Sequence, residues 1–338
     1  MLRLSVVIPA WNAERELAVA LPAALAAAGE WPVLVVDAGS TDGTASLAEC
    51  LGASLLRLPQ RAGPAEARNA GVARTAGEVV LFLDADCVAH PDVVSRTLAA
   101  FEADPALVAL TGSYDADPPE PNFFSQYMNL RHRSTHQRAR RENATFWAGC
   151  GAVRRSAFER VGGFDAARYP RPMIEDIELA TRLAPLGRMC LDPELQVTHL
   201  KRWTLRGVVE TDVRSRAIPW AELIAATGRM PDDLNLRWRE RAAGATAPLA
   251  LLSLLALPAA ALSGSGVLAA ASLAILGVAL ALGAPLIGDL ARLRGPGFAL
   301  RAWLFHQVHL CYSAATFAIC TALHHLRRRG GRRRPMAS

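Results

Sequence analysis

The sequence predicts an α/β domain followed by helices that contact a membrane. In the first part of the chain, short runs rich in Val, Ile and Leu alternate with helical patterns, which is typical of a parallel sheet built from right-handed crossovers. The predicted strands span residues 4–8, 33–36, 54–58 and 79–83. The chain is 51% hydrophobic, and much of this apolar content follows Ala245. The two parts are therefore expected to face different surroundings, water and lipid.

Turn residues and helical patterns separate these strands. Pro9 stops the first strand, and a loop over residues 37–44 supplies capping residues for the helix behind it. Later in the chain, a turn at Pro193 precedes a short strand-like run at residues 196–199. Five helices are expected. The first spans residues 14–28, the second ends near Leu51, the third carries Arg68 and Asn69, the fourth starts near Pro91 and the fifth spans residues 174–183.

Two carboxylates, Asp84 and Asp86, follow the strand at residues 79–83. Alternate residues of a strand share a face, so both side chains point the same way if strand geometry continues for two more residues. Open α/β sheets bind ligands at this end of their strands. Two carboxylates there suit Mg²⁺ or Mn²⁺ carried with the phosphates of a substrate. In isolation the same sequence is more often a solvated turn, so the assignment depends on the other acidic residues.

A third acidic residue, Asp37, ends the strand at residues 33–36. It either accepts hydrogen bonds from a nucleobase or ribose, or caps the following helix. No G-x-G-x-x-G sequence follows the first strand and no Walker sequence occurs, which argues against a nicotinamide, flavin or P-loop site.

Arginine carries almost all of the positive charge. The formal net charge is +6, and Lys201 is the only lysine among 37 basic residues. Several arginines gather near the C-terminus in a pattern that attracts anionic surfaces. They are Arg327, Arg328, Arg329, Arg332, Arg333 and Arg334. No aromatic-interleaved basic patch accompanies them, so no nucleic-acid partner is expected.

Four sequence blocks occur in order along the predicted sheet domain. They are Val7-Ile8-Pro9-Ala10-Trp11-Asn12, Val36-Asp37-Ala38-Gly39-Ser40-Thr41-Asp42-Gly43-Thr44, Ala67-Arg68-Asn69-Ala70-Gly71 and Leu83-Asp84-Ala85-Asp86. Together they resemble the successive blocks of glycosyltransferase family 2, whose members have the GT-A fold, a nucleotide-diphospho-sugar transferase fold with a mixed central sheet. The resemblance implies the same fold here. Ala38 stands where the family often has a second Asp, which leaves the identity of the nucleotide base open.

The predicted helix at residues 174–183 begins with three acids. They resemble the family's Glu-Asp block, which ends in the catalytic base. The resemblance implies Asp176 as the base and Glu175 as its orienting neighbour or substitute. The alternative is structural, because acids favour a helix N-terminus and Glu178 can pair with Arg182.

Residues 146–155 and 161–165 are similar to the family's acceptor-side segment, where glycines let the backbone approach a bound sugar. The resemblance also implies a donor site and a metal site. The nucleotide-sugar residues would be Pro9, Asn12, Asp37, Arg68, Asp84, Gly149 and Gly151. The metal ligands would be Asp84, Asp86 and His199, with Mg²⁺ or Mn²⁺ as cofactor. A lone histidine is more often structural than a ligand, so both roles stay open for His199.

Residues 245–262 and 267–287 lack charges, and each is near the length of about 20 residues that spans a bilayer. The short link between them predicts a transmembrane hairpin. A third apolar stretch, residues 302–323, either spans the membrane or lies at its interface. Three polar residues interrupt it, namely His306, Gln307 and His309.

Arginines flank the hairpin on both sides, and the positive-inside rule places both flanks in the cytoplasm. They are Arg237, Arg239, Arg241, Arg292, Arg294 and Arg301. A third span at residues 302–323 would put the arginine-rich tail outside, against the same rule. The helical pattern from Trp203 to Trp238 suits an interfacial helix, but Pro219 argues against one continuous helix.

These observations predict a multi-pass protein of the cell (inner) membrane with a cytoplasmic catalytic domain. Its expected parts are a GT-A domain at 1–227, a linker at 228–244, a membrane region at 245–326 and a basic tail at 327–338. By resemblance, the activity is inverting transfer of a sugar from a UDP- or GDP-sugar to a hydroxyl or phosphate of a lipid or lipid-linked acceptor. Arg68 would stabilise the departing diphosphate. A metal-dependent nucleotidyltransferase and a non-catalytic membrane scaffold are the alternatives.

Overall fold

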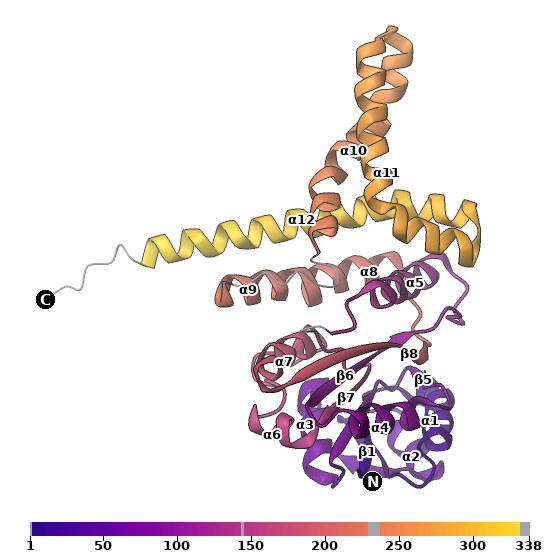
Figure 1. The fold of residues 1–338 in the computed structure, drawn as a ribbon, viewed down its shortest axis with the longest axis vertical. Coiled ribbons are helices and arrows are strands. Elements are labelled where there is room, and N and C mark those ends of the chain that lie inside the picture. The colour runs from indigo at the N-terminus through magenta and orange to yellow at the C-terminus, as the bar shows by residue number, and fades with distance from the viewer. Residues whose placement is uncertain (1, 143–144, 229–236, 332–338) are drawn as a thin grey trace, which may run out of the picture. The chain divides into compact units, whose positions relative to one another are not determined.

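A computed structural model describes residues 2–142, 145–228 and 237–331 of the chain (Figure 1). The chain divides into two compact units, Met1–Thr204 and Leu205–Ser338. Residues 205–227, which the sequence assigned to the catalytic domain, therefore belong to the same unit as the long apolar helices. Parts of the expected linker and of the basic tail, residues 229–236 and 332–338, lie outside the described residues.

One mixed sheet forms the centre of the first unit. Its strands are β1 (Leu4–Ala10), β2 (Val33–Asp37), β3 (Ser54–Arg57), β4 (Val79–Leu83), β5 (Cys87–Ala89), β6 (Leu107–Tyr114), β7 (Cys150–Arg154) and β8 (Arg188–His199), in the order β3-β2-β1-β4-β7-β6-β8-β5. The pairings among β3, β2, β1 and β4 are parallel, as the alternation of strands and helices predicted. β7 is antiparallel to β4 and β6, and β5 is antiparallel to β8. These antiparallel pairings make the sheet mixed, as the resemblance implied.

Helices cover both faces of this sheet. They are α1 (Glu14–Ala28), α2 (Thr44–Cys50), α3 (Pro64–Arg74), α4 (Val93–Ala103), α5 (Phe123–Arg138), α6 (Arg155–Arg160) and α7 (Glu175–Leu183). All of β4 is buried, and its neighbouring residues Leu81 and Phe82 enter different hydrophobic clusters. Leu81 belongs to the cluster that includes Leu21 of α1, whereas Phe82 packs near Phe158 of α6. The prediction that β4 is buried on both faces is confirmed.

β8 is longer than the sequence suggested. It has 12 residues and passes through Pro193, whereas a short strand was expected at residues 196–199. The pairing of β8 with β6 shifts register between Thr111 and Ser113, and Pro193 falls within this irregularity. The missing N–H of the proline therefore lies where the ladder is already interrupted, which is where a strand tolerates proline.

The described part of the second unit consists of helices. They are α8 (Leu205–Glu210), the π-helix η2 (Thr211–Ala217), α9 (Ile218–Thr227), α10 (Trp238–Ser263), α11 (Gly266–Arg294) and α12 (Pro296–Gly331). α8, η2 and α9 follow one another without a gap, but the π-helix separates the two α-helices and α9 ends at Thr227, so the described part of this segment is not one continuous α-helix. Pro219 lies in the first turn of α9, directly after the π-helix, where the regular hydrogen-bond pattern of an α-helix is already interrupted.

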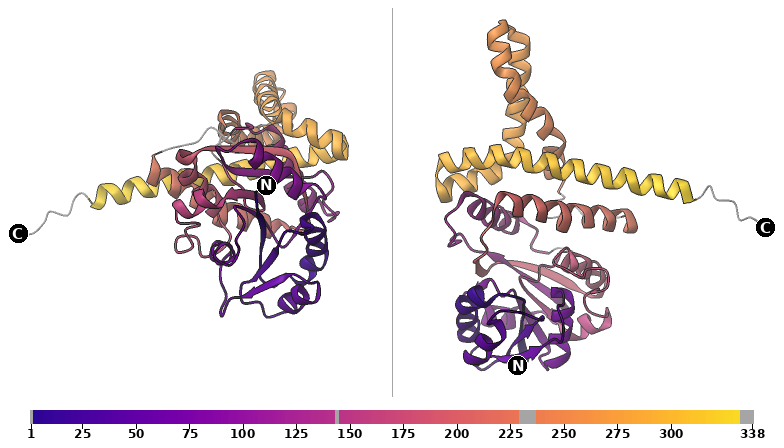
Figure 2. Two further views of the ribbon diagram at one scale, coloured as in Figure 1. Left: turned by 60° about the horizontal axis from the view of Figure 1, so that its bottom comes forward. Right: turned by 180° about the vertical axis from the view of Figure 1, so that it is seen from behind.

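α10 and α11 form a hairpin, and α12 runs crosswise to it (Figures 1 and 2). Within the described chain, α10 and α11 are the two helices long and apolar enough to cross a bilayer. Large apolar side chains point outward from both of them. Examples are Leu249, Leu252, Leu255, Leu273 and Val278.

Candidate functional site

Arg68 joins three elements at the carboxyl ends of the strands. Its guanidinium, carried by α3, donates to Oδ1 of Asp84 at 2.6 Å and to Oε1 of Glu175 at 3.0 Å. Arg68 is 4% exposed. Burial alone would lower its pKa, but the charges of Asp84 and Glu175 outweigh burial and raise the pKa. This pairing holds together α3, the turn after β4 and the start of α7.

Glu175, the first residue of α7, is buried and has partners on both carboxylate oxygens. Oε1 accepts from Arg68, and Oε2 accepts from the N–H of Met173 at 2.8 Å. Of the two roles left open by the sequence, that of orienting neighbour therefore fits Glu175 better than that of substitute base. Farther along α7, Glu178 pairs with Arg182 at 2.6 Å, as the structural alternative expected.

Asp176, the second residue of α7, has a different environment. Oδ2 accepts from the N–H of Ala148 at 3.3 Å, and Oδ1 accepts from the N–H of Ile177 at 2.8 Å. Burial, followed by the charge of Glu175, raises the pKa of Asp176 to about 7 against the opposing effect of Arg68. Because this pKa is raised in the folded state, Asp176 contributes to the free energy of unfolding at low pH, and this contribution is lost as the pH rises through about 7. A carboxyl group with such a pKa suits a general base near neutral pH.

Asp86 and His199 form a second pair at this end of the sheet. Pairing of β5 with β8 aligns Cys87 with His199, and Nε2 of His199 lies 3.3 Å from Oδ2 of Asp86. Burial by itself raises the pKa of Asp86, but the charge of His199 and, more weakly, that of Lys201 lower it to about 2. Asp86 is therefore a carboxylate at neutral pH.

Two residues that the sequence analysis did not identify hold the ring of His199. Oδ1 of Asn129, in α5, lies 2.5 Å from Nδ1 of His199. The ring of Tyr114, at the end of β6, stacks on the imidazole with 4.4 Å between centroids and 11° between planes. With the Asn129 amide assigned in this orientation, Nδ1 of His199 donates to Oδ1 of Asn129, and Nε2 is the ring nitrogen that faces Asp86. No sequence signal marks these two residues, because their role depends on how α5 packs against the sheet.

The pair of Asp86 and His199 fits a divalent metal that also binds substrate phosphates. Carboxylate oxygen and imidazole nitrogen are suitable ligands, and a ligating histidine usually donates its other N–H to a protein acceptor, as His199 does to Asn129. Across residues 2–142, 145–228 and 237–331, no group of three or more His, Cys, Asp or Glu side chains is placed to hold a metal ion. Substrate oxygens would have to complete the coordination, as is common for Mg²⁺.

Asp84 has different partners from Asp86. Strand geometry ends at Leu83, so the argument from alternate residues does not extend to both acids. The side chain of Asp84 accepts from Arg68, and its N–H donates to the carbonyl oxygen of Gly149 at 3.1 Å. The structure therefore groups Asp84 with Arg68 and groups Asp86 with His199.

The loops after β1 and β2 are tied together at the same end of the sheet. Asn12, which has a positive φ of 47°, accepts through Oδ1 from the N–H of Thr41 at 2.8 Å. Asp37 ends β2, and its Oδ1 accepts from the N–H of Ser40 at 3.0 Å. The first N–H of α2 donates to Asp42. The helix-capping role considered for Asp37 therefore falls to Asp42.

The remaining predicted sugar-site residues have evident structural roles. Pro9 lies within β1, opposite Val36 of β2. A Cβ atom at Gly149 would lie 2.4 Å from Cζ2 of Trp147, and one at Gly151 would lie 2.2 Å from the carbonyl oxygen of Trp147. The packing of Trp147 on its own loop therefore requires both glycines, a reason that the sequence analysis did not supply.

Comparison with known sequences identifies the first unit. Residues 5–162 match the family described as Glycosyl transferase family 2. A pre-mycofactocin glycosyltransferase of Mycobacterium tuberculosis is 30% identical over 185 residues, which are 52% of this chain and 38% of that protein. The uncharacterized glycosyltransferase YfnE of Bacillus subtilis is 32% identical over 113 residues, which are 32% of this chain and 29% of that protein. The chain thus spans well under half the length of these curated relatives.

A solved structure has the same fold. The mannosyltransferase PcManGT from Pyrobaculum calidifontis, in complex with GDP-Man and Mn²⁺, matches with a TM-score of 0.61 and 24% sequence identity. The match covers 95% of this chain and 87% of that one. The mixed sheet of the first unit is therefore a GT-A fold, as the resemblance implied.

Removal of Arg68 should destabilise the first unit strongly. Arg68→Ala leaves Glu175 and Asp84 without their counter-charge, and breaking a buried pair in this way costs about 3–5 kcal/mol. Arg57 is the matched control, because it pairs at 2.9 Å with Glu49 on the surface. Arg57→Ala should cost less than about 1 kcal/mol. The free energies of unfolding of the two full-length variants are compared by urea unfolding. If both variants lose the same free energy of unfolding, the central role of Arg68 is contradicted.

Proposed function

The chain belongs to glycosyl transferase family 2 through residues 5–162, and we propose that it is an inverting glycosyltransferase of the cell inner membrane. It transfers a sugar from a UDP- or GDP-sugar to a hydroxyl or phosphate group of a lipid or lipid-linked acceptor. The observation that carries this proposal is the Arg68 junction. It fixes the start of α7, and with it Asp176, whose pKa is about 7, at the sheet end that also carries Asp86 and His199.

The donor site is proposed at the carboxyl ends of the parallel strands, where α/β sheets bind their ligands. Asp37 lies there at the end of β2, next to the loop that Asn12 holds. It would accept hydrogen bonds from the ribose or the base of the donor. PcManGT, which shares the fold, was solved with GDP-Man and Mn²⁺, which supports a nucleotide-sugar donor and a divalent metal here.

Asp86 and His199 would hold the Mg²⁺ or Mn²⁺ ion. The ion would offset the charge of the donor diphosphate and so ease its departure. The hydrogen bond from Nδ1 to Asn129 leaves Nε2 of His199 to bind the ion, and stacking on Tyr114 fixes the plane of the imidazole ring. Asp84, held by Arg68, would reach the ribose of the donor or the water shell of the ion.

Asp176 would act as the general base. The acceptor oxygen attacks the anomeric carbon from the side opposite the diphosphate, the bond between this carbon and the diphosphate oxygen breaks, and the acceptor proton passes to Asp176. Glu175 has both oxygens committed to Arg68 and Met173, which favours Asp176 for this role. Because the guanidinium of Arg68 is likewise engaged, we assign it to the positioning of Glu175 and Asp84. The resemblance had instead implied that Arg68 stabilises the departing diphosphate.

The apolar helices of the second unit support the proposal of a lipid acceptor. α10 and α11 are long and apolar enough to cross a bilayer, and leucines such as Leu252 and Leu255 point outward from α10. Nucleotide sugars are made in the cytoplasm, so the first unit is placed on that side. The arginines that flank the hairpin agree with this orientation.

The proposed reaction predicts metal-dependent release of a nucleoside diphosphate. The purified full-length protein, given UDP- or GDP-sugars, Mn²⁺ and extracted membrane lipid, should label the lipid with sugar and release nucleoside diphosphate in equal amount. EDTA should stop both events, and added Mn²⁺ should restore them. Release of pyrophosphate would instead indicate a nucleotidyltransferase, and a lack of nucleotide binding would indicate a scaffold.

Asp86→Ala should weaken Mn²⁺ binding by at least about tenfold, since even changes behind the ligands cost about 10–100-fold. Electron paramagnetic resonance of free Mn²⁺ in the presence of nucleoside diphosphate measures the affinity without turnover. His90→Gln is the control, because His90 pairs at 3.0 Å with Asp115 instead, and this variant should bind Mn²⁺ normally. If Asp86→Ala retains the wild-type affinity, the metal assignment is wrong.

Asp176→Asn should lower turnover by about 10²–10⁴-fold, the usual contribution of a general base, while donor binding stays unchanged. The wild-type rate should rise as the pH passes through about 7, because Asp176 then loses its proton. This rise should be absent from the residual activity of Asp176→Asn. Rate profiles between pH 5 and 9 and donor titrations test both points. Joint loss of donor binding and of thermal stability would favour a purely structural role at the start of α7.

A further inference from the structure

α12 carries an exposed apolar stripe along one side. Its residues recur at helical spacing and are Leu300, Leu304, Val308, Ile319 and Leu323. The helix contains the apolar stretch at residues 302–323, yet among the described helices the two suited to crossing a bilayer are α10 and α11. The stripe therefore needs an apolar environment that does not require α12 to span the membrane.

A buried polar cluster fixes the middle of α12 to η2. Asp212 of η2 is 2% exposed. It accepts from the hydroxyl of Tyr312 at 2.7 Å and lies 2.9 Å from Nδ1 of His309. Arg216, one turn along, donates to the same carboxylate at 2.9 Å. The centre of α12 is thus tied to a segment that begins directly after the first unit.

This cluster is incompatible with a third span at residues 302–323. Tyr312 lies in the middle of that stretch, so a spanning α12 would carry Tyr312 to the centre of the bilayer. Asp212 and Arg216 would have to follow it, and charged groups at that depth are costly. At the interface the same groups remain close to water. The cluster therefore favours an α12 that stays at the depth of η2.

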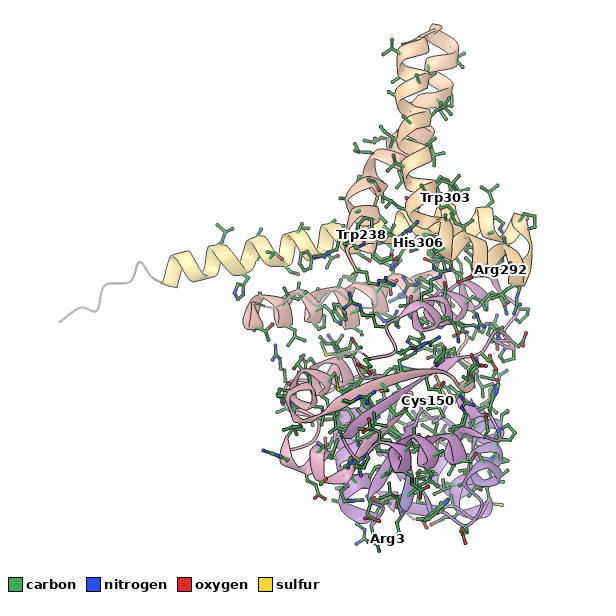
Figure 3. All side chains as sticks on the ribbon, viewed as in Figure 1. Arg3, Cys150, Trp238, Arg292, Trp303 and His306 are labelled. Carbon is green, nitrogen blue, oxygen red and sulfur yellow. The ribbon has the colours of Figure 1, made fainter. Side chains whose placement is uncertain are left out.

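The packing of α12 on the hairpin agrees with this placement. Leu310 packs with Ala243 and Ala247 near the start of α10, and Trp303 packs with Ala250 and Ala279. The helix crosses the hairpin at the end where the chain enters and leaves it, and Figure 3 shows Trp303 and His306 at this crossing. A third span would be expected to run along the hairpin instead.

The sequence at the end of α12 is rich in positive charge, which suits an anionic partner. The arginines that follow the stripe are the six residues between Arg327 and Arg334 named above, and none of the residues from Ala302 to Ser338 is acidic. Clusters of this kind bind the anionic headgroups of the cytoplasmic leaflet. An α12 at that interface also removes the conflict over the tail, because all flanking arginines then lie on one side.

We propose that α12 lies in the plane of the membrane interface, with its apolar stripe in the lipid and its arginine-rich end on anionic phospholipid. It lies on the same side as α8, η2 and α9, so the chain crosses the membrane twice. This inference rests on the proposal that α10 and α11 span a bilayer.

Spin-label depth measurements test the inference on the full-length chain. Cys50, Cys190, Cys311 and Cys320 are replaced by Ser, and the buried Cys87 and Cys150 are retained. One cysteine at a time is then introduced for labelling, as Leu300→Cys, Val308→Cys or Ile319→Cys. In vesicles of phosphatidylcholine with one-third phosphatidylglycerol, the three labels should report the same shallow depth. Labels at Leu249→Cys, Leu255→Cys and Leu262→Cys provide the comparison, and their depths should change along α10.

The outcomes separate the two proposals. If the α12 labels show the same progression of depth as the α10 labels, α12 spans and the inference is overturned. If the α10 labels themselves stay shallow or exposed to water, the proposed membrane anchor fails and the inference fails with it. In vesicles of phosphatidylcholine alone, the label at Ile319→Cys should become shallower while the α10 labels do not move. An unchanged depth at Ile319→Cys would overturn the role assigned to anionic lipid.

Discussion

A guanidinium that is almost wholly removed from water must be neutralised where it lies, and Arg68 is neutralised by carboxylates from two distant parts of the chain. Asp84 follows the central strand β4, and Glu175 begins α7 more than ninety residues later. Without the cation, two acids and the adjacent Asp176 would face one another in a poorly hydrated space, an arrangement that raises their free energy steeply. The position of α7, and with it the position of the proposed base, therefore depends on a single buried positive charge.

The two halves of the proposed site are held in different ways. On one side, the backbone of the loop before β7 contacts both acids, because Ala148 donates to Asp176 and Gly149 accepts from Asp84. On the other side, strand pairing between β5 and β8 aligns the segments that carry Asp86 and His199. Main-chain contacts of this kind tolerate little adjustment. The relative placement of the proposed base and the proposed metal ligands therefore depends on the sheet and its connecting loop as well as on Arg68.

Local patterns in the sequence predicted much of this architecture. The helix at Glu14–Ala28 and the strand at Val79–Leu83 have the expected bounds, because a helical repeat and an unbroken apolar run can both be recognised from neighbouring residues alone. The same reasoning did not predict β7 or its antiparallel direction, which depends on the path of the chain through α5. It also failed for the extension of β8 through Pro193, which is possible only because β6 shifts its register there.

The candidate site was predictable to a similar degree. Asp86 and Asp176 could be found in the sequence because the blocks that contain them resemble those of glycosyltransferase family 2, although acids at strand and helix ends also have structural explanations. Asn129 and Tyr114 could not be found in this way, because an amide in a helix and a ring at a strand end gain their roles only when tertiary packing brings them to His199. The separate partners of Asp84 and Asp86 follow from the end of strand geometry at Leu83, a boundary that hydrophobic pattern locates only approximately.

The π-helix between α8 and α9 has a consequence for how the second unit can vary. A π turn contains about one residue more than an α turn, which rotates everything downstream by about 100° relative to a regular helix. The face that α9 presents to α12 is therefore governed by the seven residues of η2 and not by continuity with α8. A one-residue insertion or deletion there would turn α9 about its own axis without disturbing the sheet domain. The number of residues in this short segment thus sets the rotational register between α8 and the helix α9 that follows it.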